Sequence, residues 1–148
     1  AGLLITGAVQ GELQVVDMRN GRMRLSIPAA PGQLLSAAAL SPDGRLIAAG
    51  SPAGTIRLID ASTGSTLRRL DGHRGRIHGL AFSPESDRLV SGSADHTAKV
   101  WDTATGRELL TLEEHAGPIV RARFSHDGRQ ILTASQDSTL MTWDSVAY

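Results

Sequence analysis

The sequence predicts an all-β fold made of four-stranded antiparallel sheets, because one 42-residue pattern recurs three times along the chain. Three turns share one register and begin at Ser41, Ser83 and Ser125, and three aspartates share another, at Asp60, Asp102 and Asp144. Between each turn and its aspartate lie a small residue and an apolar alternation of period two, which is typical of strands. A repeat of ~40 to 45 residues with four short strands per unit is typical of a β-propeller, in which each unit forms one blade.

The third unit shows the four strands of a blade most clearly. Residues 77–83 alternate apolar and small side chains and predict the first strand. A turn over residues 83–86 leads to a second strand at 89–93, whose small residues suit the close approach of neighbouring sheets. Tight turns then lead to a third strand at 98–102 and a fourth at 108–112, which completes an antiparallel meander.

The same frame assigns strands to the rest of the chain. It predicts strands at 35–40, 46–50, 55–60 and 66–70 in the second unit, and at 119–125, 131–135 and 139–144 in the fourth. The first unit fits once an extra residue is placed within 28–32, and it then supplies three strands and lacks the first. We therefore predict one propeller segment over residues 1–148, with a partial blade at 1–33, blades at 34–75 and 76–117, and a partial blade at 118–148.

Composition argues against several classes of function. The chain has 15 basic and 15 acidic residues and a net charge of zero, so no long-range field favours nucleic acid or an anionic membrane. Cysteine is absent, which excludes disulfides, thiolate catalysis and thiolate metal sites. No apolar run approaches the ~18 residues that span a bilayer, and no leader pattern opens the sequence, so we expect a cytoplasmic protein. No motif predicts a cofactor.

Two sets of four polar residues recur at identical spacing. His73 is followed by Ser91, Asp95 and Trp101 at offsets of 18, 22 and 28 residues. The next unit repeats these offsets with His115, Thr133, Asp137 and Trp143. This arrangement resembles the WD-repeat family, and the weaker repeat frame around it covers the whole chain. The resemblance implies that each set forms a hydrogen-bonded tetrad inside a blade, which satisfies buried polar groups and fastens a loop to two strands.

The first tetrad also has the composition of a hydrolase triad, in His73, Ser91 and Asp95. A nucleophilic serine needs exposure, an oxyanion hole and usually a strained turn, whereas Ser91 is predicted in mid-strand inside the sheet. An enzyme also rarely has two copies of its site at repeat spacing. The five histidines fall in separate loops, strands and turns and do not make a metal-ligand set. We therefore expect structural tetrads, with no catalytic residue and no metal site.

The tetrad is missing from the first half of the chain. Its positions hold Pro31, Ala49, Ala53 and Ile59 in the second unit, and its last three positions hold Thr6, Gln10 and Val16 in the first. Blades that lack the tetrad depend on apolar packing. We therefore expect the N-terminal half to be the less stable one.

The resemblance also implies where a partner binds. In the WD-repeat family, contacts on the narrow top face come from the residues three and five after the tetrad histidine and from the residue before the tetrad aspartate. The matching positions hold Arg76, His78 and Ala94 in the third unit, Pro118, Val120 and Gln136 in the fourth, and Leu34, Ser36 and Pro52 in the second. Taken singly, each is best interpreted as solvated surface. Together, an arginine beside apolar residues suits the centre of a protein or peptide contact.

A group of arginines near the second unit's end suggests a phosphate or nucleic-acid site: Arg68, Arg69, Arg74 and Arg76. Acidic residues at corresponding positions offset this charge: Asp71, Glu113 and Glu114. A solvated and locally paired surface is therefore the better interpretation.

The leading hypothesis is a protein-interaction scaffold, the regulatory or sensor propeller of a larger multidomain protein, with a protein or peptide partner and with no nucleic-acid or membrane partner. The alanine- and arginine-rich composition without cysteine resembles bacterial WD repeats attached to signalling ATPases, kinases or proteases. The alternative from another class is an enzyme with its site in the propeller channel. No constellation of acid, base and nucleophile in the sequence supports that alternative.

The number of repeats raises the question of ring closure. WD-type propellers usually close with about seven blades, because each sheet needs a neighbour on both faces, and this chain holds roughly half of them. Either the remaining blades belong to the parent chain, or two or more copies associate to close a ring. The ragged strand boundaries favour a fragment of a larger propeller over a self-associating half-propeller.

Overall fold

The computed structural model describes residues 2–7, 12–28 and 34–145, and all the regular structure in these ranges is β. Their fourteen strands form four antiparallel sheets of three, four, four and three strands. This confirms the predicted fold class. Within the same ranges no helix is long and apolar enough to cross a membrane.

Each sheet is a meander in which strands that follow one another in sequence pair with one another. The first sheet contains β1 (Leu3–Gly7), β2 (Leu13–Asp17) and β3 (Arg22–Ile27). The second contains β4 (Ala37–Leu40), β5 (Leu46–Gly50), β6 (Ile56–Asp60) and β7 (Thr66–Leu70). The third contains β8 (Ile77–Phe82), β9 (Arg88–Ser93), β10 (Ala98–Asp102) and β11 (Glu108–Leu112). The fourth contains β12 (Ile119–Phe124), β13 (Gln130–Ser135) and β14 (Leu140–Asp144).

These bounds agree closely with the strands predicted from the repeat. The largest difference is at β4, which begins at Ala37 and not at residue 35. Just before it, the Ser36 hydroxyl donates to the carbonyl of Ile77 at 2.7 Å, so this residue links the second sheet to the third. The predicted insertion within 28–32 lies, apart from Pro28, outside the described residues.

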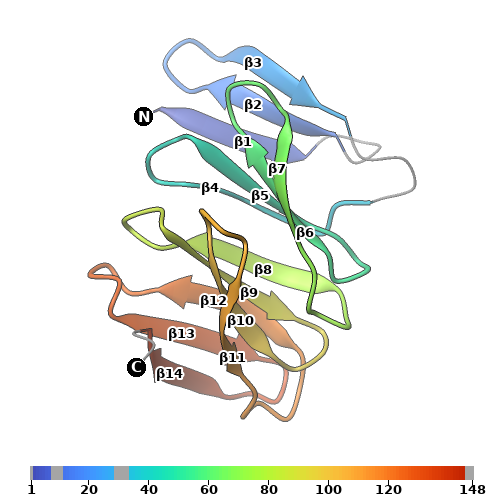
Figure 1. Ribbon diagram of the computed structural model, residues 1–148, viewed down its shortest axis with the longest axis vertical. Helices are drawn as coiled ribbons and strands as arrows, with labels where there is room; N and C mark the ends of the chain where they lie inside the picture. The colour runs from blue at the N-terminus through green and yellow to red at the C-terminus, as the bar shows by residue number, and fades with distance from the viewer. Residues whose placement is uncertain (1, 8–11, 29–33, 146–148) are drawn as a thin grey trace.

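The sheets follow one another along the long axis of the molecule, from the first sheet at the top of Figure 1 to the fourth at the bottom. β8 packs beside β4 on one side and beside β12 on the other. These three strands are the first of their sheets, so the sheets align along one edge, which we call the inner edge.

The apolar core is divided among the spaces between successive sheets. Between the first and second sheets it includes Leu13, Val15, Ile47 and Ile59, and between the second and third Ile56, Leu58, Ile77, Leu89 and Trp101. Between the third and fourth sheets it includes Val90, Val100, Ile119 and Ile131. Each sheet therefore gains stability mainly from its nearest neighbours, as in other repeat proteins.

Two glycines show how closely these sheets approach. A Cβ atom on Gly50 would lie 2.6 Å from Cγ2 of Ile77, and one on Gly92 would lie 2.7 Å from Cγ2 of Ile119. Each isoleucine belongs to the next sheet. The small residues predicted in the second strand of a blade are therefore required by the packing.

The repeated serine turns have a common hydrogen-bonding pattern. The Ser41 hydroxyl donates to Asp43 at 2.6 Å and accepts the amide of Leu46 at 2.9 Å. Ser125 makes the same two bonds in the fourth sheet, and Ser83 in the third bonds Asp87. A single hydroxyl thus closes each turn between the first and second strands of a sheet.

Candidate functional site

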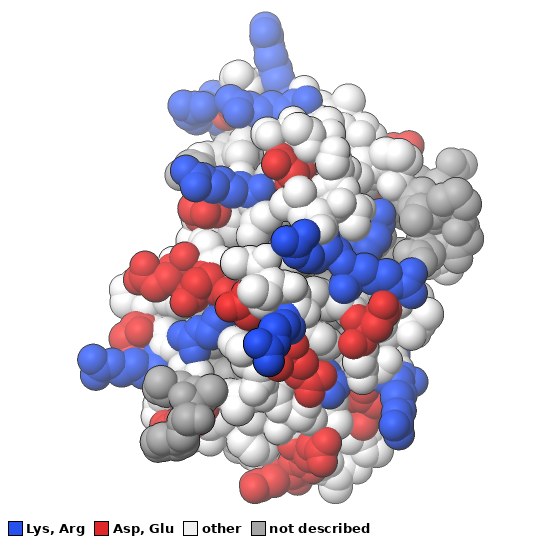
Figure 2. Space-filling view, viewed as in Figure 1, with Lys and Arg blue, Asp and Glu red and all other residues white. Residues whose placement is uncertain are grey.

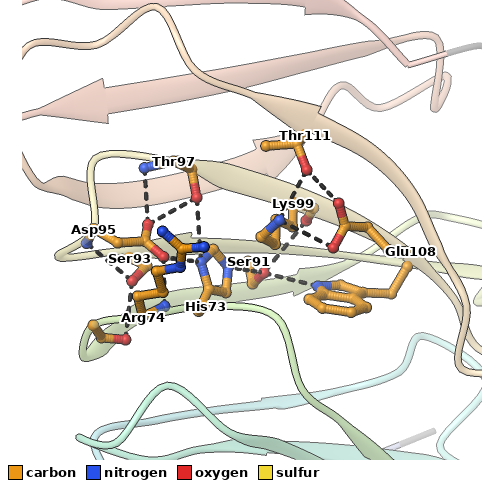
Figure 3. Close-up of polar contacts among 11 residues, drawn as sticks. His73, Arg74, Ser91, Ser93, Asp95, Thr97, Lys99, Glu108 and Thr111 are labelled. Carbon is orange, nitrogen blue, oxygen red and sulfur yellow. Dashed lines mark hydrogen bonds and ion pairs between the residues drawn. The ribbon is translucent and has the colours of Figure 1, made fainter.

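Four polar side chains of the third sheet form one chain of hydrogen bonds, shown in Figure 3. Trp101, on β10, donates its indole N–H to the Ser91 hydroxyl on β9 at 2.8 Å. The same hydroxyl lies 2.8 Å from Nε2 of His73, in the loop between β7 and β8. Nδ1 of His73 lies 2.8 Å from Oδ2 of Asp95, in the turn between β9 and β10. This chain of bonds, which we call the relay, therefore ties the loop before the sheet to two strands and a turn within the sheet.

A neutral imidazole at His73 satisfies every donor in this relay. Burial lowers the pKa of His73, and this effect outweighs the opposing effect of the Asp95 carboxylate. In the neutral ring Nδ1 donates to Asp95, while Nε2 accepts from the Ser91 hydroxyl. That hydroxyl in turn accepts from Trp101.

The carboxylate at the end of the relay gathers several donors. The backbone amide of Arg74 donates to Asp95 at 2.9 Å, and the Thr97 hydroxyl donates at 2.7 Å. Burial alone would raise the pKa of Asp95, but the hydrogen bonds from Arg74, Thr97 and His73 lower it to about 2. Asp95 is therefore ionised at neutral pH and holds the loop by charge-assisted bonds.

The fourth sheet repeats the relay. Trp143 donates its indole N–H to the Thr133 hydroxyl at 2.8 Å, and that hydroxyl lies 2.7 Å from Nε2 of His115. Nδ1 of His115 lies 3.1 Å from Oδ2 of Asp137. Hydrogen bonds from the Thr139 hydroxyl and from nearby backbone amides hold the pKa of Asp137 well below its usual range.

A fifth member of each relay was missed by the sequence reasoning. The Thr97 hydroxyl lies 3.3 Å from Nδ1 of His73, and the Thr139 hydroxyl lies 3.0 Å from Nδ1 of His115. Each threonine also bonds the relay aspartate. The signal was present, because the two threonines stand 42 residues apart and each follows its aspartate by two.

The relay of the third sheet has a polar neighbour that was also not predicted. Lys99 Nζ lies 3.0 Å from Oε2 of Glu108 and donates to the Thr111 hydroxyl at 2.9 Å (Figure 3). These side chains join β10 to β11 beside the indole of Trp101.

The first half of the chain lacks the His, Ser or Thr, Asp and Trp set at the tetrad positions. Ala49 and Ile59 are buried in the core between the first and second sheets. Ala53 and Thr6 are exposed, and Val16 is half-buried. The remaining positions, Pro31 and Gln10, lie outside the described residues.

The geometry of the first tetrad is not that of an accessible nucleophile. Ser91 is 0 % exposed, and its hydroxyl already bonds both His73 and Trp101. Among the residues that the structure describes, no three or more His, Asp or Glu side chains are grouped so that they could hold a metal ion. What this arrangement can do is fix the positions of surface loops.

Four of the six predicted partner residues of the third and fourth sheets lie in loops that are joined in pairs, whereas His78 lies on β8 and Val120 on β12. The amide of Ala94 donates to the carbonyl of Arg76 at 2.8 Å, and the amide of Gln136 donates to the carbonyl of Pro118 at 2.9 Å. The turn that contains Pro52 lies against the loop of His73, because a Cβ on Gly54 would be 2.6 Å from the His73 carbonyl oxygen. We call this end of the sheets the top face.

The exposure of the nine predicted residues divides them into two groups. The exposed ones are Leu34, Pro52, Arg76 and Gln136, and the half-buried ones are Ser36, His78, Ala94, Pro118 and Val120. Ser36 is engaged in linking two sheets. His78 and Val120 line a groove along the inner edge, whereas Leu34 and Ser36 line a separate cavity between the first and second sheets.

Charges of both signs alternate over the face shown in Figure 2. In the arginine group noted in the sequence, Arg69 is paired with Asp71, with Nε 2.9 Å from Oδ2. Arg68 donates to the carbonyl of Ala104 at 3.2 Å and so links the second sheet to the third. Two of these arginines thus have local partners on the protein.

Comparison with known proteins shows which family of repeats the sequence matches. The family model described as "WD domain, G-beta repeat" matches residues 25–60, 64–102 and 106–144. The second and third matches begin just before β7 and β11 and end with β10 and β14, so each repeat joins the last strand of one sheet to three strands of the next. No curated protein matches the chain.

A solved structure with the same arrangement is the crystal structure of the computationally designed Ika4 protein. It is 27% identical to this chain, and the two superpose with a TM-score of 0.84. The matched region covers 99% of this chain and 87% of that one.

Proposed function

Because the chain belongs to the WD-repeat family, we propose that it is a protein-interaction scaffold whose top face contacts a protein or peptide partner. WD-repeat domains usually bind protein partners and are typically non-catalytic. The observation that carries the proposal is that the two relays hold the loops of the top face, and that these loops present exposed side chains.

The loop from His73 to Arg76 is held both by the side chains of the relay and by a backbone hydrogen bond. His73 and the amide of Arg74 both bond Asp95, and the carbonyl of Arg76 accepts from Ala94. Arg76 therefore projects from a backbone that is held at both ends of a short segment. Fixed backbone reduces the conformational entropy that binding would otherwise cost.

The same construction supports the second loop. His115 and the amide of Ala116 bond Asp137, and the carbonyl of Pro118 accepts from Gln136. Exposed Arg76 thus stands on the anchored loop before β8, and exposed Gln136 stands on the anchored turn between β13 and β14 of the neighbouring sheet. Arginine is one of the residues enriched at the centre of protein contacts.

The proposal extends to the context of the chain. We assign it to the regulatory or sensor propeller of a larger multidomain protein in the cytoplasm, in which the parent chain or a second copy supplies further blades. The resemblance of its composition to WD repeats attached to signalling enzymes supports this assignment.

The test is site-specific photo-crosslinking in the cells that produce the protein. A photoreactive amino acid is introduced at Arg76 or Gln136 on the top face, and at Arg107 in the β10–β11 turn as the control. The proposal expects one discrete protein adduct from both top-face positions and none from the control. Adducts that form equally well from position 107, or no adduct from either top-face position, would overturn it.

A further inference from the structure

A groove of about 380 Å³ opens between the second and third sheets. It is bordered by β5, β7 and the turns β4–β5, β8–β9 and β10–β11. In an antiparallel meander these turns lie at the end opposite the turns between second and third strands, so the groove lies away from the top face. Leu46 and Leu67 form part of its wall, and Leu67 is 44% exposed. Its volume is within the ~300 to 1,000 Å³ typical of ligand sites.

The groove is open because a leucine stands where the next junction between sheets has an arginine. Leu46 begins β5 and Arg88 begins β9, 42 residues later. The Arg88 side chain crosses to the fourth sheet, where its guanidinium donates to the carbonyls of Gly128 and Ser145. The repeat equivalents of these two residues border the open groove. The shorter side chain of Leu46 therefore leaves unfilled the space that Arg88 occupies one junction later.

The two junctions also carry charges of opposite sign. Beside Arg88 the positions equivalent to 43 and 45 hold Glu85 and Asp87, and Nε of Arg88 lies 3.7 Å from Oδ1 of Asp87. At the open groove Arg45 stands at the position of Asp87, and Arg68 stands where the third sheet has a leucine. The acidic junction is thus filled by a cationic side chain, whereas the open groove is bordered by two cationic side chains.

These two arginines have no acidic partner among residues 2–7, 12–28 and 34–145, since none of the ion pairs in these ranges includes either of them. Arg68 donates to two main-chain carbonyls. Asp43 also borders the groove, but its carboxylate accepts from the Ser41 hydroxyl at 2.6 Å and from the amide of Arg45 at 3.0 Å, within its own turn. The border therefore has two positive charges and one negative charge that is already hydrogen-bonded.

The groove between the first and second sheets shows a different chemistry. Leu3 stands at the position of Leu46, and a space of about 350 Å³ is open there too. The arginine that borders it, Arg24, is paired, with Nη2 2.8 Å from Oδ2 of Asp17. Of these two grooves, the one between the second and third sheets is the one whose arginines lack an acidic partner within the described residues.

We propose that the groove between the second and third sheets binds a segment of a partner protein in which a carboxylate side chain stands beside an apolar one. The carboxylate accepts charge-assisted hydrogen bonds from Arg45 and Arg68. The apolar side chain covers Leu46 and Leu67. This occupant matches the groove as Arg88 matches the acidic junction, with the charges exchanged. The site does not use the exposed residues of the top face.

The probe is a fluorescein-labelled decapeptide of glutamate and leucine, titrated with the chain and followed by fluorescence anisotropy. The expected result is that Arg45→Ala/Arg68→Ala weakens binding at least about tenfold, because each arginine contributes charge-assisted hydrogen bonds. The matched control is Arg129→Ala, at the position of the fourth sheet that is equivalent to 45, and it leaves binding unchanged.

Arg45→Glu/Arg68→Glu tests the same site by a gain of binding. This variant is expected to lose the glutamate peptide and to bind a decapeptide of lysine and leucine, which the native chain does not bind. Thermal unfolding followed by circular dichroism checks that both double variants remain folded at the temperature of the titration.

Three outcomes would overturn the proposal: no binding of the glutamate peptide, full binding of it by the double alanine variant, or equal binding of the glutamate and lysine peptides by the native chain. Position 107 is close to the groove, since a Cβ on Gly106 would lie 3.5 Å from Cδ of Arg68. The photo-crosslinking is therefore repeated with Arg45→Glu/Arg68→Glu. This variant keeps the adducts from positions 76 and 136, and an adduct from position 107 that it abolishes belongs to the groove.

Discussion

Ser91 lies at the centre of a buried polar group in the third sheet. Its hydroxyl receives the indole N–H of Trp101 and lies within hydrogen-bond distance of His73, and it is completely buried. Because every polar atom has a partner, the buried group stabilises the sheet without the penalty of an unpaired donor or acceptor. The described residues contain no buried side-chain nitrogen or oxygen without a hydrogen bond.

The relay makes stability depend on pH through its carboxylate. The folded-state pKa of Asp95 is about 2, below the ordinary value of about 3.9 that applies to the unfolded chain. A depressed folded-state pKa contributes stability above the unfolded value and loses it as the pH falls toward the folded value. We therefore expect Asp95→Asn to lower the melting temperature at pH 7, and the difference from the native chain to shrink between about pH 4 and pH 2.

Thermal unfolding followed by circular dichroism across this pH range makes the comparison. Asp137→Asn in the equivalent relay should follow the same course, since the pKa of Asp137 is also lowered. A difference in melting temperature that stays constant from pH 7 to pH 2 would show that the carboxylate charge does not hold the loop.

At the scale of the strand, stability comes from how closely each sheet packs on the next. Arg88 on β9 illustrates a link across such a contact: its guanidinium donates to the carbonyl of Gly128 at 3.2 Å and lies 5.2 Å from the ring centre of Phe124. Both partners belong to the region of the fourth sheet. The side chain therefore adds a cation–π contact and a hydrogen bond to the apolar packing between β9 and β12.

Glycine in the second strand of a sheet provides the sharpest test of this packing. Gly92→Ala is expected to destabilise the chain by about 1 to 3 kcal/mol, because the new methyl group would overlap Ile119. Gly7→Ala is the matched control, since a Cβ there has no atom of the described residues within 4 Å, and it should change stability by no more than about 0.5 kcal/mol. Denaturant unfolding measures both.

A double variant separates steric overlap from other effects. Ile119→Ala removes Cγ2, the atom that a Cβ on Gly92 would meet most closely, so the two changes together should cost less than the sum of their separate effects. Strict additivity, or a cost for Gly92→Ala as small as that for Gly7→Ala, would contradict the packing argument.

The sequence was sufficient to predict the strands and the tetrads because both depend on residue identity at fixed spacing. The four members of a tetrad are chemically distinctive, so their second occurrence at the same offsets, from His115 to Trp143, identified the set. Thr97 was not predicted, although it recurs as Thr139 at the repeat spacing, because threonine is also common in turns where it has no such role.

At the scale of the whole molecule, the sheets built by one repeat differ in their number of strands, in their packed neighbours and in whether they contain a relay. The third sheet has four strands, a neighbour on each face and a relay, whereas the first has three strands, lacks the tetrad residues and packs against one described neighbour. In a stacked repeat protein local stability follows such nearest-neighbour contacts. The central claim of this account is that apolar contacts between sheets and the polar relays together determine which loops are rigid enough to present a binding surface.

Native-state hydrogen exchange, resolved by mass spectrometry, tests this claim most directly. The account predicts that amides of β9 and β10 exchange most slowly, that those of β13 follow, and that those of β1 to β3 exchange fastest. It also predicts slow exchange for the amides of Arg74 and Ala116, which bond the relay aspartates. Uniform exchange across the four sheets, or fast exchange of these two loop amides beside slow exchange in the first sheet, would contradict it.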